Sequence, residues 1–481
     1  MYNTLPMTSF AVVTLGCKVN HYESLQVEQF LGTLGYSRTT PDAADVIILN
    51  TCSVTSAAGA KSRNLLRRYC RPRSSGRTPL TIAIGCWAAS DTAAAQSIIG
   101  PSLVLTHQDD LHSRLLQLLT PNPPEGSVTI LPQPTAGNAP GTRSLPLLSA
   151  HQPNTQRAIL KVQDGCDAHC TYCIIPRLRP VLWHKPIDQT IQEASALVTA
   201  GHSEIVLTGV FLGAYGHNTA IRGRQFAISH SLSLLIDALC TRVPGLHRLR
   251  LSSLEPGDLT PDLLRTLAAH PQIMPHFHLP LQSGSDAILR RMNRQYASGD
   301  YLKTIQNLRD RFDRPAFTTD VIVGFPGETD DLFAQTLDLI RQVGFLHIHA
   351  FPFSPRQGTA AARWKKQFIH SQTITDRMHQ LQQLSLSQSF TYRQQFLNQT
   401  AEILVERPSG PDGPNDQAPS STRHQAPSTD LALRHGRCER YFTIHFDPPS
   451  GDPDLTGRLV RLKITRATPD RTFGEFVTAR F

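Results

Sequence analysis

The chain has 481 residues, of which 40% are hydrophobic and 18% charged, as is typical of an ordinary soluble protein with two or three domains. Its 47 basic and 38 acidic side chains leave a charge of +9, which suits a polyanionic partner such as nucleic acid but is equally explained by solubility alone. No apolar run approaches the roughly 18–20 residues of a membrane helix, and residues 1–20 lack the features of a signal peptide. We therefore expect a cytoplasmic protein whose nine cysteines stay reduced and are better metal ligands than disulfide partners.

Three strand-like apolar runs open the chain, and a cysteine follows each of them. The runs cover residues 11–15, 45–50 and 80–85, and the cysteines are Cys17, Cys52 and Cys86. Helical patterns, such as those of residues 28–35 and 61–69, lie between the runs, and this alternation predicts a parallel α/β domain over residues 8–120. Functional residues of such sheets collect at the carboxyl ends of the strands, where we expect the three cysteines.

A second series of alternating strands and helices is expected over residues 157–397, after a Pro- and Gly-rich flexible linker at 121–156. Its six strands are predicted at 158–163, 204–209, 247–252, 276–280, 317–324 and 344–351. Six such units predict an incomplete barrel of the TIM type, with its site at the carboxyl ends of the strands. Residues 376–397 are expected to form a long polar helix that closes this domain.

The remaining residues, 398–481, predict a small β-barrel. Its strands are expected at 401–406, 440–446 and 457–467, and a Pro- and Ser-rich insert at 408–430 is expected to be disordered. Basic residues crowd the last strands, with two aromatic residues nearby: Arg458, Arg461, Lys463, Arg466, Arg471, Tyr441 and Phe442. Such a set suits the RNA backbone and unstacked bases, and the alternative is an ordinary solvated face.

The strongest chemical signal is the cysteine motif CxxxCxxC, formed by Cys166, Cys170 and Cys173 on a loop after a predicted strand. Three thiolates at this spacing can hold three irons of a [4Fe–4S] cluster and leave the fourth iron open. A molecule with adjacent amino and carboxylate groups can chelate that iron, and one-electron reduction of a bound sulfonium then yields a 5′-deoxyadenosyl radical. A zinc knuckle is the alternative, but a fourth ligand is missing unless His169 folds back on its own loop. The motif therefore predicts a radical S-adenosylmethionine (SAM) enzyme, with Tyr172 packed against the adenine.

Eight segments occur in the order and spacing of one enzyme family, the methylthiotransferases. They are TLGCKVNHYES (14–24), NTCSVT (50–55), GCWA (85–88), the CxxxCxxC segment, EIVLTGVFLGAYG (204–216), RLSSLEP (250–256), LPLQSGSDAILRRM (279–292) and TDVIVGFPGET (319–329). The chain thus resembles this family over nearly its whole length, apart from the linker and the insert. The first segment resembles the MtaB type, which acts on threonylcarbamoyladenosine in tRNA. Sister branches act on isopentenyladenosine in tRNA or on an aspartate of a ribosomal protein. The C-terminal region resembles the TRAM domain, a small RNA-binding β-barrel.

The resemblance implies a second [4Fe–4S] cluster on Cys17, Cys52 and Cys86, whose open iron carries the sulfur to be inserted. Their separations of 35 and 34 positions (52 − 17 and 86 − 52) fit no local metal motif, and three unrelated buried cysteines remain the alternative. The implied reaction is methylthiolation at C2 of N6-threonylcarbamoyladenosine next to the anticodon, by a monomer that also needs an electron donor and a sulfur source. Two alternatives stay open: the same chemistry on another branch's substrate, and a non-catalytic iron–sulfur RNA-binding protein.

The resemblance also implies contacts to SAM at the ends of the barrel strands. The residues concerned are Gly209 and Val210 for the methionine amino group, Ser253 and Glu255 for the ribose or the amino group, Gln282 with Ser283, and Val323, Gly324 and Phe325 for the adenine. After the motif, Arg179-Pro180 and His184-Lys185-Pro186 stand where the family usually has Arg-Gly and Ser-Arg-Pro. Proline fixes φ and removes a donor, and lysine lacks the arginine fork, so we expect a differently shaped loop there.

Overall fold

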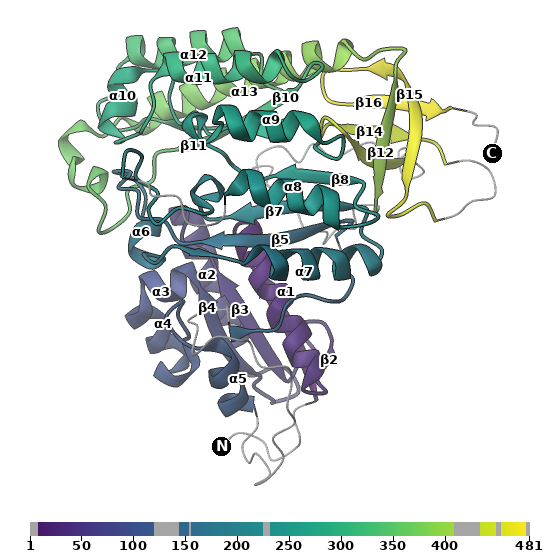
Figure 1. Cartoon of the computed structure of the whole chain (residues 1–481). Coiled ribbons are helices and arrows are strands. Elements are labelled where there is room, and N and C mark those ends of the chain that lie inside the picture. Colours follow the sequence, from purple (N-terminus) through teal and green to yellow (C-terminus); the bar gives the residue numbers. More distant parts are fainter. Residues whose placement is uncertain are drawn as a thin grey trace.

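The computed structural model describes residues 8–119, 144–152, 155–224, 231–407, 433–448 and 454–477. Figure 1 shows an N-terminal α/β part at the bottom, a central barrel above it and a small C-terminal barrel at the right. Among the described helices, none combines the length and the apolar character that crossing a membrane requires.

The N-terminal part is a four-stranded parallel sheet with helices on both faces. Its strands are β1 (Ser9–Thr14), β2 (Ser37–Arg38), β3 (Val46–Thr51) and β4 (Leu80–Gly85), in the order β2-β1-β3-β4. Its helices are α1 (Lys18–Thr33), α2 (Ser56–Tyr69), α3 (Cys86–Ser90), α4 (Thr92–Ile99) and α5 (Leu111–Leu119). Strand β3 is buried throughout, as expected for a continuous apolar run covered on both faces. One face packs on Phe30 of α1 and Leu115 of α5, the other on Leu66 of α2 and Ala95 of α4.

The central part contains six parallel strands that form an incomplete barrel. They are β5 (Arg157–Asp164), β7 (Glu204–Gly209), β8 (Arg248–Leu251), β9 (His276–His278), β10 (Ala316–Val323) and β11 (His347–Pro352). A short strand β6 (Trp183–His184) pairs antiparallel with β5, and a bridge between Leu249 and Ile273 links the β5-β7-β8 group to the β9-β10-β11 group. The surrounding helices are α6 (Ile175–Leu178), α7 (Ile187–Thr199), α8 (Leu232–Arg242), α9 (Pro261–Ala269), α10 (Asp286–Arg291), α11 (Ser298–Arg309), α12 (Asp330–Val343) and α13 (Ser371–Gln394).

Side chains along the barrel strands alternate between an apolar outer face and a polar inner face. In β10, Phe317, Val321 and Val323 belong to the large apolar core, which also contains residues of the surrounding helices, whereas Thr318 accepts or donates hydrogen bonds with His276 and His278. The period of two is that of a strand with two different faces. The interior of this barrel is therefore polar.

The C-terminal part is a closed five-stranded barrel in the order β12-β13-β14-β16-β15. Its strands are β12 (Thr400–Glu406), β13 (Arg434–Cys438), β14 (Thr443–Phe446), β15 (Leu459–Ala467) and β16 (Thr472–Phe476). In β15, Leu462 and Ile464 are buried while Arg461 and Lys463 are exposed. This barrel covers the amino-terminal end of the central one, because Arg250 donates to the backbone carbonyls of Cys438 and Glu439.

The predicted fold class is confirmed: a parallel α/β part, a partial barrel of parallel strands and a small closed β-barrel. The strand predicted from 440 begins later, at Thr443, because Tyr441 has φ +75° in a tight turn. The prediction that Tyr441 and Phe442 bind unstacked RNA bases is wrong, because both rings pack inside the protein. The Tyr441 ring stacks on His276 with centroids 4.4 Å apart, and Phe442 is buried in the core of its own barrel.

The expected flexible linker differs from the structure in the part that is described. Residues 144–152 pack on the N-terminal part: Leu145 and Leu148 are buried, and Gln29 donates to the carbonyl of Leu147 over 2.7 Å. Burial of these leucines stabilises an ordered path that composition alone does not predict. The rest of the linker up to residue 143, and the whole insert 408–430, lie outside the described residues.

Candidate iron–sulfur and S-adenosylmethionine site

The first cysteine set, Cys17, Cys52 and Cys86, lies where three neighbouring parallel strands end. Cys17 precedes α1, Cys52 follows β3 directly, and Cys86 begins α3 at the end of β4. Gly16 has φ +106°, and a Cβ added there would lie 3.0 Å from the Cys52 sulfur, so the loop before Cys17 passes close to that thiol. Burial, with contributions from the other two thiols, raises the pKa of Cys86 to about 12. The sheet therefore brings together three cysteines that are far apart in sequence.

Two basic side chains that the sequence motifs do not predict lie beside this first set. His107 Nε2 is 3.7 Å from the Cys86 sulfur, and burial followed by the charge of Arg179 lowers the pKa of His107 to about 3, which leaves its imidazole neutral. Arg356, on the segment after β11, acts electrostatically on Cys52. Its Nε and Nη2 atoms are buried without a hydrogen-bond partner. Neither residue belongs to a local sequence pattern, so only the fold reveals them.

The second set, Cys166, Cys170 and Cys173, lies on the loop between β5 and α6. The loop turns at Gly165, which has φ +79° and whose added Cβ would lie 2.0 Å from the carbonyl oxygen of Val181. It is held from both sides, since Cys166 N donates to Arg179 O over 3.0 Å and Thr171 N to Met292 O over 3.0 Å. Burial raises the pKa values of Cys166 and Cys173 to about 12.

Arg294 connects this loop to a predicted site residue, Glu255, which lies in the segment after β8. Its Nη1 donates to the Cys170 sulfur over 3.3 Å, and its Nη2 donates to Glu255 Oε1 over 2.6 Å. The Tyr172 hydroxyl lies 3.4 Å from Nη1. The arginine lies two residues beyond the LPLQSGSDAILRRM segment, so proximity in sequence to that segment was the only available signal.

The residues predicted to contact adenine make their contacts with other residues of the protein. Phe325 is fully buried and contacts Tyr172 edge to face, with ring centroids 6.4 Å apart. Gly324 N donates to Glu328 Oε2, and Val323 O accepts from Phe353 N. A Cβ at Gly324 would lie 2.4 Å from the Ile374 side chain, so the close approach there is to α13.

The other predicted contacts fall into two groups. A Cβ at Gly209 would lie 2.8 Å from Gln163 Oε1, so glycine is required by packing within the barrel, and Val210 beside it is half-buried. Gln282 has φ +62° and pairs through its backbone with β10. The buried Ser283, the exposed Ser253 and Glu255 complete the predicted set, and of the strand-end residues only Glu255 is tied to the Cys170 sulfur through Arg294.

A buried network of charges links the two cysteine sets. Glu23 of α1 pairs with Lys161 over 2.6 Å and with Arg179 over 2.7 Å, and both cations also pair with Asp164. Arg179 reaches both sets, because its carbonyl accepts from Cys166 N and its charge lowers the pKa of Cys86 against the effect of burial. Helix α3 contacts α6, and the two lie next to each other in Figure 1. The helix that begins at Cys86 therefore contacts the helix that follows Cys173.

The family departure at Lys185 also has a structural account. Lys185 is buried, pairs with Glu193 and donates to the Tyr22 hydroxyl over 2.8 Å. It therefore joins α7 to α1 of the N-terminal part rather than lying in the loop beside the cysteines.

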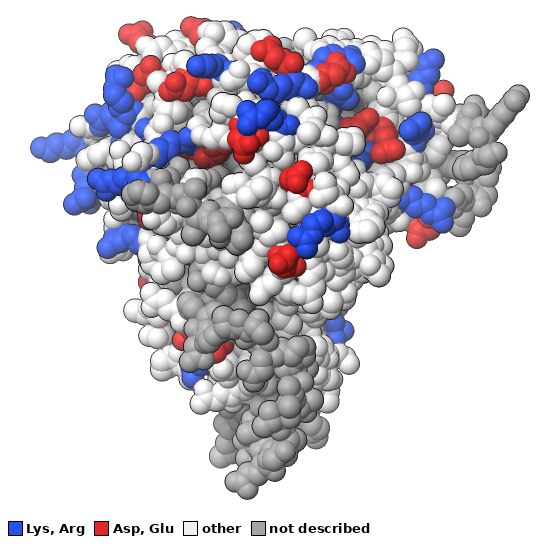
Figure 2. Space-filling model, in the orientation of Figure 1, with Lys and Arg blue, Asp and Glu red and all other residues white. Residues whose placement is uncertain are grey.

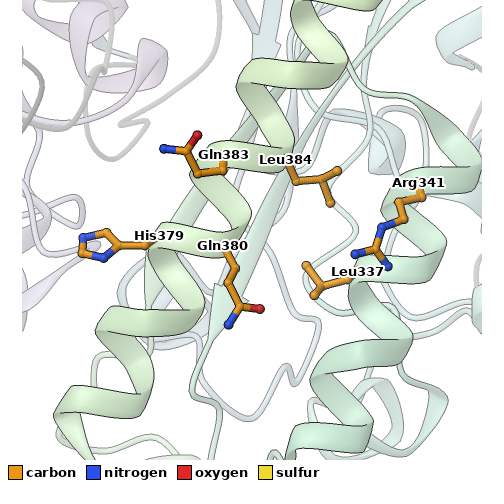
Figure 3. A pocket seen from close by; sticks show the side chains of 6 residues that line it. All are labelled: Leu337, Arg341, His379, Gln380, Gln383 and Leu384. Carbon is orange, nitrogen blue, oxygen red and sulfur yellow. The ribbon is translucent and has the colours of Figure 1, made fainter.

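A shallow, open hollow of about 400 Å³ lies elsewhere, between α12 and α13, on the far side of the barrel from the N-terminal part (Figures 1 and 3). It is lined by Leu337, Arg341, His379, Gln380, Gln383 and Leu384. None of these is a cysteine or a predicted site residue. The cysteine sets, and not this hollow, contain thiols that can bind iron.

The donor atoms of the two sets are of the kind that iron–sulfur clusters require, since each set offers three thiols. A cubane takes one thiolate at each of several separate irons, so its ligands stand around a wider space than those of one ion. All six thiols are free, and a cation that suits thiolate ligands lies beside each set: the half-buried Arg356 and the buried Arg294.

Fold and cysteines together define the class of protein: a radical SAM enzyme with iron–sulfur chemistry. Residues 160–340 match the family described as the Radical SAM superfamily, and residues 9–105 match the uncharacterized protein family UPF0004. Among solved structures, the radical S-adenosylmethionine methyltransferase TsrM from Kitasatospora setae shares the fold, with a TM-score of 0.52 over 74% of this chain and 77% of that chain at 13% identity.

Sequence relatives identify the family. The chain is 33% identical over 475 residues to the threonylcarbamoyladenosine tRNA methylthiotransferase MtaB of Bacillus subtilis (strain 168), covering 98% of this chain and 97% of the relative. It is 30% identical over 480 residues to the tRNA-2-methylthio-N(6)-dimethylallyladenosine synthase of Maricaulis maris, covering 98% and 97%. The chain therefore belongs to the radical SAM tRNA methylthiotransferases, enzymes that transfer a sulfur-containing group. The predicted family, enzyme class and cofactors, SAM and [4Fe–4S] clusters, are confirmed.

Proposed function

We propose that this enzyme inserts a methylthio group at C2 of N6-threonylcarbamoyladenosine, next to the anticodon of tRNA, in the cytoplasm. The observation that carries this choice of substrate is the segment TLGCKVNHYES around Cys17, which resembles the MtaB type. A second MtaB, from Chlamydia pneumoniae, is 35% identical over 404 residues, covering 84% of this chain and 88% of the relative. Relatives of both tRNA branches match, so the substrate must be argued from the site and tested directly.

In this proposal Cys166, Cys170 and Cys173 hold the cluster that binds SAM, and Cys17, Cys52 and Cys86 hold the second cluster. When bound, these groups supply the one-electron chemistry that an unreactive adenine C–H bond requires. The protein supplies position and burial. Arg294 fixes Cys170 relative to Glu255, and the buried pairs of Glu23 and Arg179 hold the two cysteine sets in a constant relation.

A basic surface beside the cysteines supports a tRNA substrate. Figure 2 shows lysines and arginines gathered at the upper left, over α10 and the segment after β11 in Figure 1. The exposed basic residues of those segments are Arg290, Arg363, Lys365 and Lys366. The segment touches both cysteine neighbourhoods, since Ala361 N donates to Thr171 O and Ser354 bonds Ser56. Phosphates bound along it would place an anticodon loop at the cysteines.

The C-terminal barrel offers a second contact. Arg461 and Lys463 point outward from β15, as TRAM-like RNA binding would require. We propose that this face and the surface over α10 bind different parts of one tRNA.

Mass spectrometry of tRNA nucleosides from a strain that lacks the gene tests the proposed function. We expect 2-methylthio-N6-threonylcarbamoyladenosine to disappear and to return on complementation. Loss of the 2-methylthio group from isopentenyladenosine would assign the other tRNA branch. An unchanged nucleoside profile would rule out both and direct attention to ribosomal protein.

A further inference from the structure

The inner face of the central barrel carries a compact group of polar side chains that the cofactors do not account for. His278, Asp320 and His349 come from three adjacent strands, and the β10–β11 register places Asp320 directly beside His349. His278 Nε2 is 3.4 Å from Asp320 Oδ2, and the rings of His278 and His349 have centroids 5.9 Å apart. Three polar groups of complementary kinds therefore line one patch of the barrel interior.

This group is reachable by solvent although protein surrounds it. The side chains of His278 and Asp320 are 17% and 30% exposed, and His347 at the edge of the patch is exposed. At the amino-terminal end of the strands, His276 is covered by the ring of Tyr441. Burial, followed by the charge of His347, lowers the pKa of His349 to about 4, so its imidazole is neutral and can both donate and accept.

A cation from the N-terminal part completes the group. Lys18 directly follows Cys17, is exposed, and lies close enough to act electrostatically on Asp320, His349 and His276. Burial raises the pKa of Asp320, but His278, His349 and Lys18 lower it further, so the carboxylate stays ionised. Arg437 of the C-terminal barrel acts on His347 and His276 from the other end. The ammonium of Lys18, which follows Cys17 of the first cysteine set, thus lies within electrostatic range of the Asp320 carboxylate and the His349 imidazole.

We propose that Lys18, Asp320 and His349 select the N6 substituent of the adenosine, and this inference rests on the proposed function. A threonylcarbamoyl group presents a carboxylate, a hydroxyl and ureido N–H groups, whereas an isopentenyl group is a hydrocarbon. Lys18 binds the carboxylate, and Asp320 accepts from the hydroxyl or a ureido N–H, with His278 and His349 beside it.

The same residues exclude the hydrocarbon. An isopentenyl group in this place would displace water from an ammonium and a carboxylate and return no hydrogen bond. Sites built for polar groups reject analogues that lack them by about 10⁴-fold, whereas apolar pockets discriminate far less. The polar inner face therefore suits the threonylcarbamoyl substrate and disfavours its sister.

The test compares binding and turnover of three anticodon stem-loop RNAs that carry threonylcarbamoyladenosine, isopentenyladenosine or adenosine. The reconstituted enzyme is compared with Lys18→Met, and Lys303→Met, an exposed lysine on α11, is the matched control. We expect Lys18→Met to weaken binding of the threonylcarbamoyl RNA by about 10- to 100-fold, the usual worth of a hydrogen bond to a charged group. Binding of the adenosine RNA should change less than about twofold.

Equal weakening of all three RNAs would overturn the inference, because Lys18 would then be a general phosphate contact. An unchanged preference for the threonylcarbamoyl RNA would overturn it as well. A second variant, Asp320→Leu, should raise the relative turnover of the isopentenyl RNA, and a fixed ratio would contradict the selective role of the patch. If the unaltered enzyme does not modify the threonylcarbamoyl RNA, the proposed function itself fails, and that result is read before any variant.

Discussion

The two cysteine sets reach similar surroundings by opposite routes. Cys166, Cys170 and Cys173 share one loop, so their spacing is visible in sequence and their geometry depends on local turns such as the one at Gly165. The first set depends on the order of parallel strands β1, β3 and β4, each followed by a cysteine. A local loop can form in many folds, whereas the first set exists only when the whole N-terminal sheet is folded. The comparison separates a site made by a motif from a site made by topology.

The largest expected effect comes from removing either set of thiols. Replacing Cys166, Cys170 and Cys173 with alanine should abolish both reductive cleavage of SAM and methylthiolation. Replacing the first set should abolish methylthiolation while cleavage of SAM persists, because that cleavage needs only the second cluster. Chromatography of 5′-deoxyadenosine and of the modified nucleoside measures both. Each triple variant should retain about half of the iron, and full iron content in either would contradict its ligand assignment.

The next effect concerns the charges between the sets. Glu23→Ala leaves Lys161 and Arg179 buried with Asp164 as their remaining partner, and breaking such a network costs about 3–5 kcal/mol in free energy of unfolding. Urea unfolding of the protein without clusters measures it. Asp338→Ala removes an exposed pair with Arg341 on α12 and should cost no more than about 1 kcal/mol. If the two variants lowered the unfolding free energy equally, the buried network would not stabilise the contact between the N-terminal part and the central barrel.

The same carboxylate gives the network a pH dependence. Burial raises the pKa of Glu23, but the charges of Arg179 and Lys161 outweigh this effect and lower that pKa from 4.5 to about 2. A carboxyl group with a depressed folded pKa stabilises fully above its unfolded value and loses that contribution as pH falls toward the folded value. The difference in unfolding free energy between the unaltered protein and Glu23→Gln should therefore be largest above pH 4.5 and shrink toward pH 2. If this difference in unfolding free energy stayed constant from pH 7 to 3, the lowered pKa of Glu23 would be contradicted.

These features also show what the sequence could and could not supply. Strands β3, β4 and β7 were placed correctly because buried parallel strands read as continuous apolar runs. Strands β13 (RHGRC) and β16 (TFGEF) were missed because each is short and contains few apolar residues, although both pair in local hairpins, with β14 and with β15. Arg294, Arg356 and His107 were missed for a related reason: each is placed by a different element, and no spacing connects any of them to the cysteine that it approaches.

A smaller effect is expected from the cation beside the second set. Arg294→Met removes the donor to Cys170 and leaves Glu255 with Arg222, 3.6 Å away. Partners that orient cluster ligands are commonly worth 10- to 100-fold in activity or affinity, so cleavage of SAM should fall by about that factor. The reduction potential of the cluster gives an independent readout and should become more negative when a nearby positive charge is lost. Unchanged potential and rate would remove Arg294 from the site.

The smallest effect, and the sharpest contrast, is expected at the cation beside the first set. The two terminal nitrogens of Arg294 have three partners and its Nε has none, whereas both Nε and Nη2 of Arg356 are buried without a partner. A buried donor that makes no hydrogen bond is a cost to the folded state, so Arg356→Met should leave the unfolding free energy within about 1 kcal/mol or raise it slightly. Arg294→Met should lower it by more, because Glu255 loses its closest partner. Calorimetry of the two variants, each prepared without clusters, measures both unfolding free energies. A loss of stability at Arg356 as large as that at Arg294 would mean that Nε and Nη2 of Arg356 are hydrogen-bonded in solution, and the contrast between the two cations would disappear.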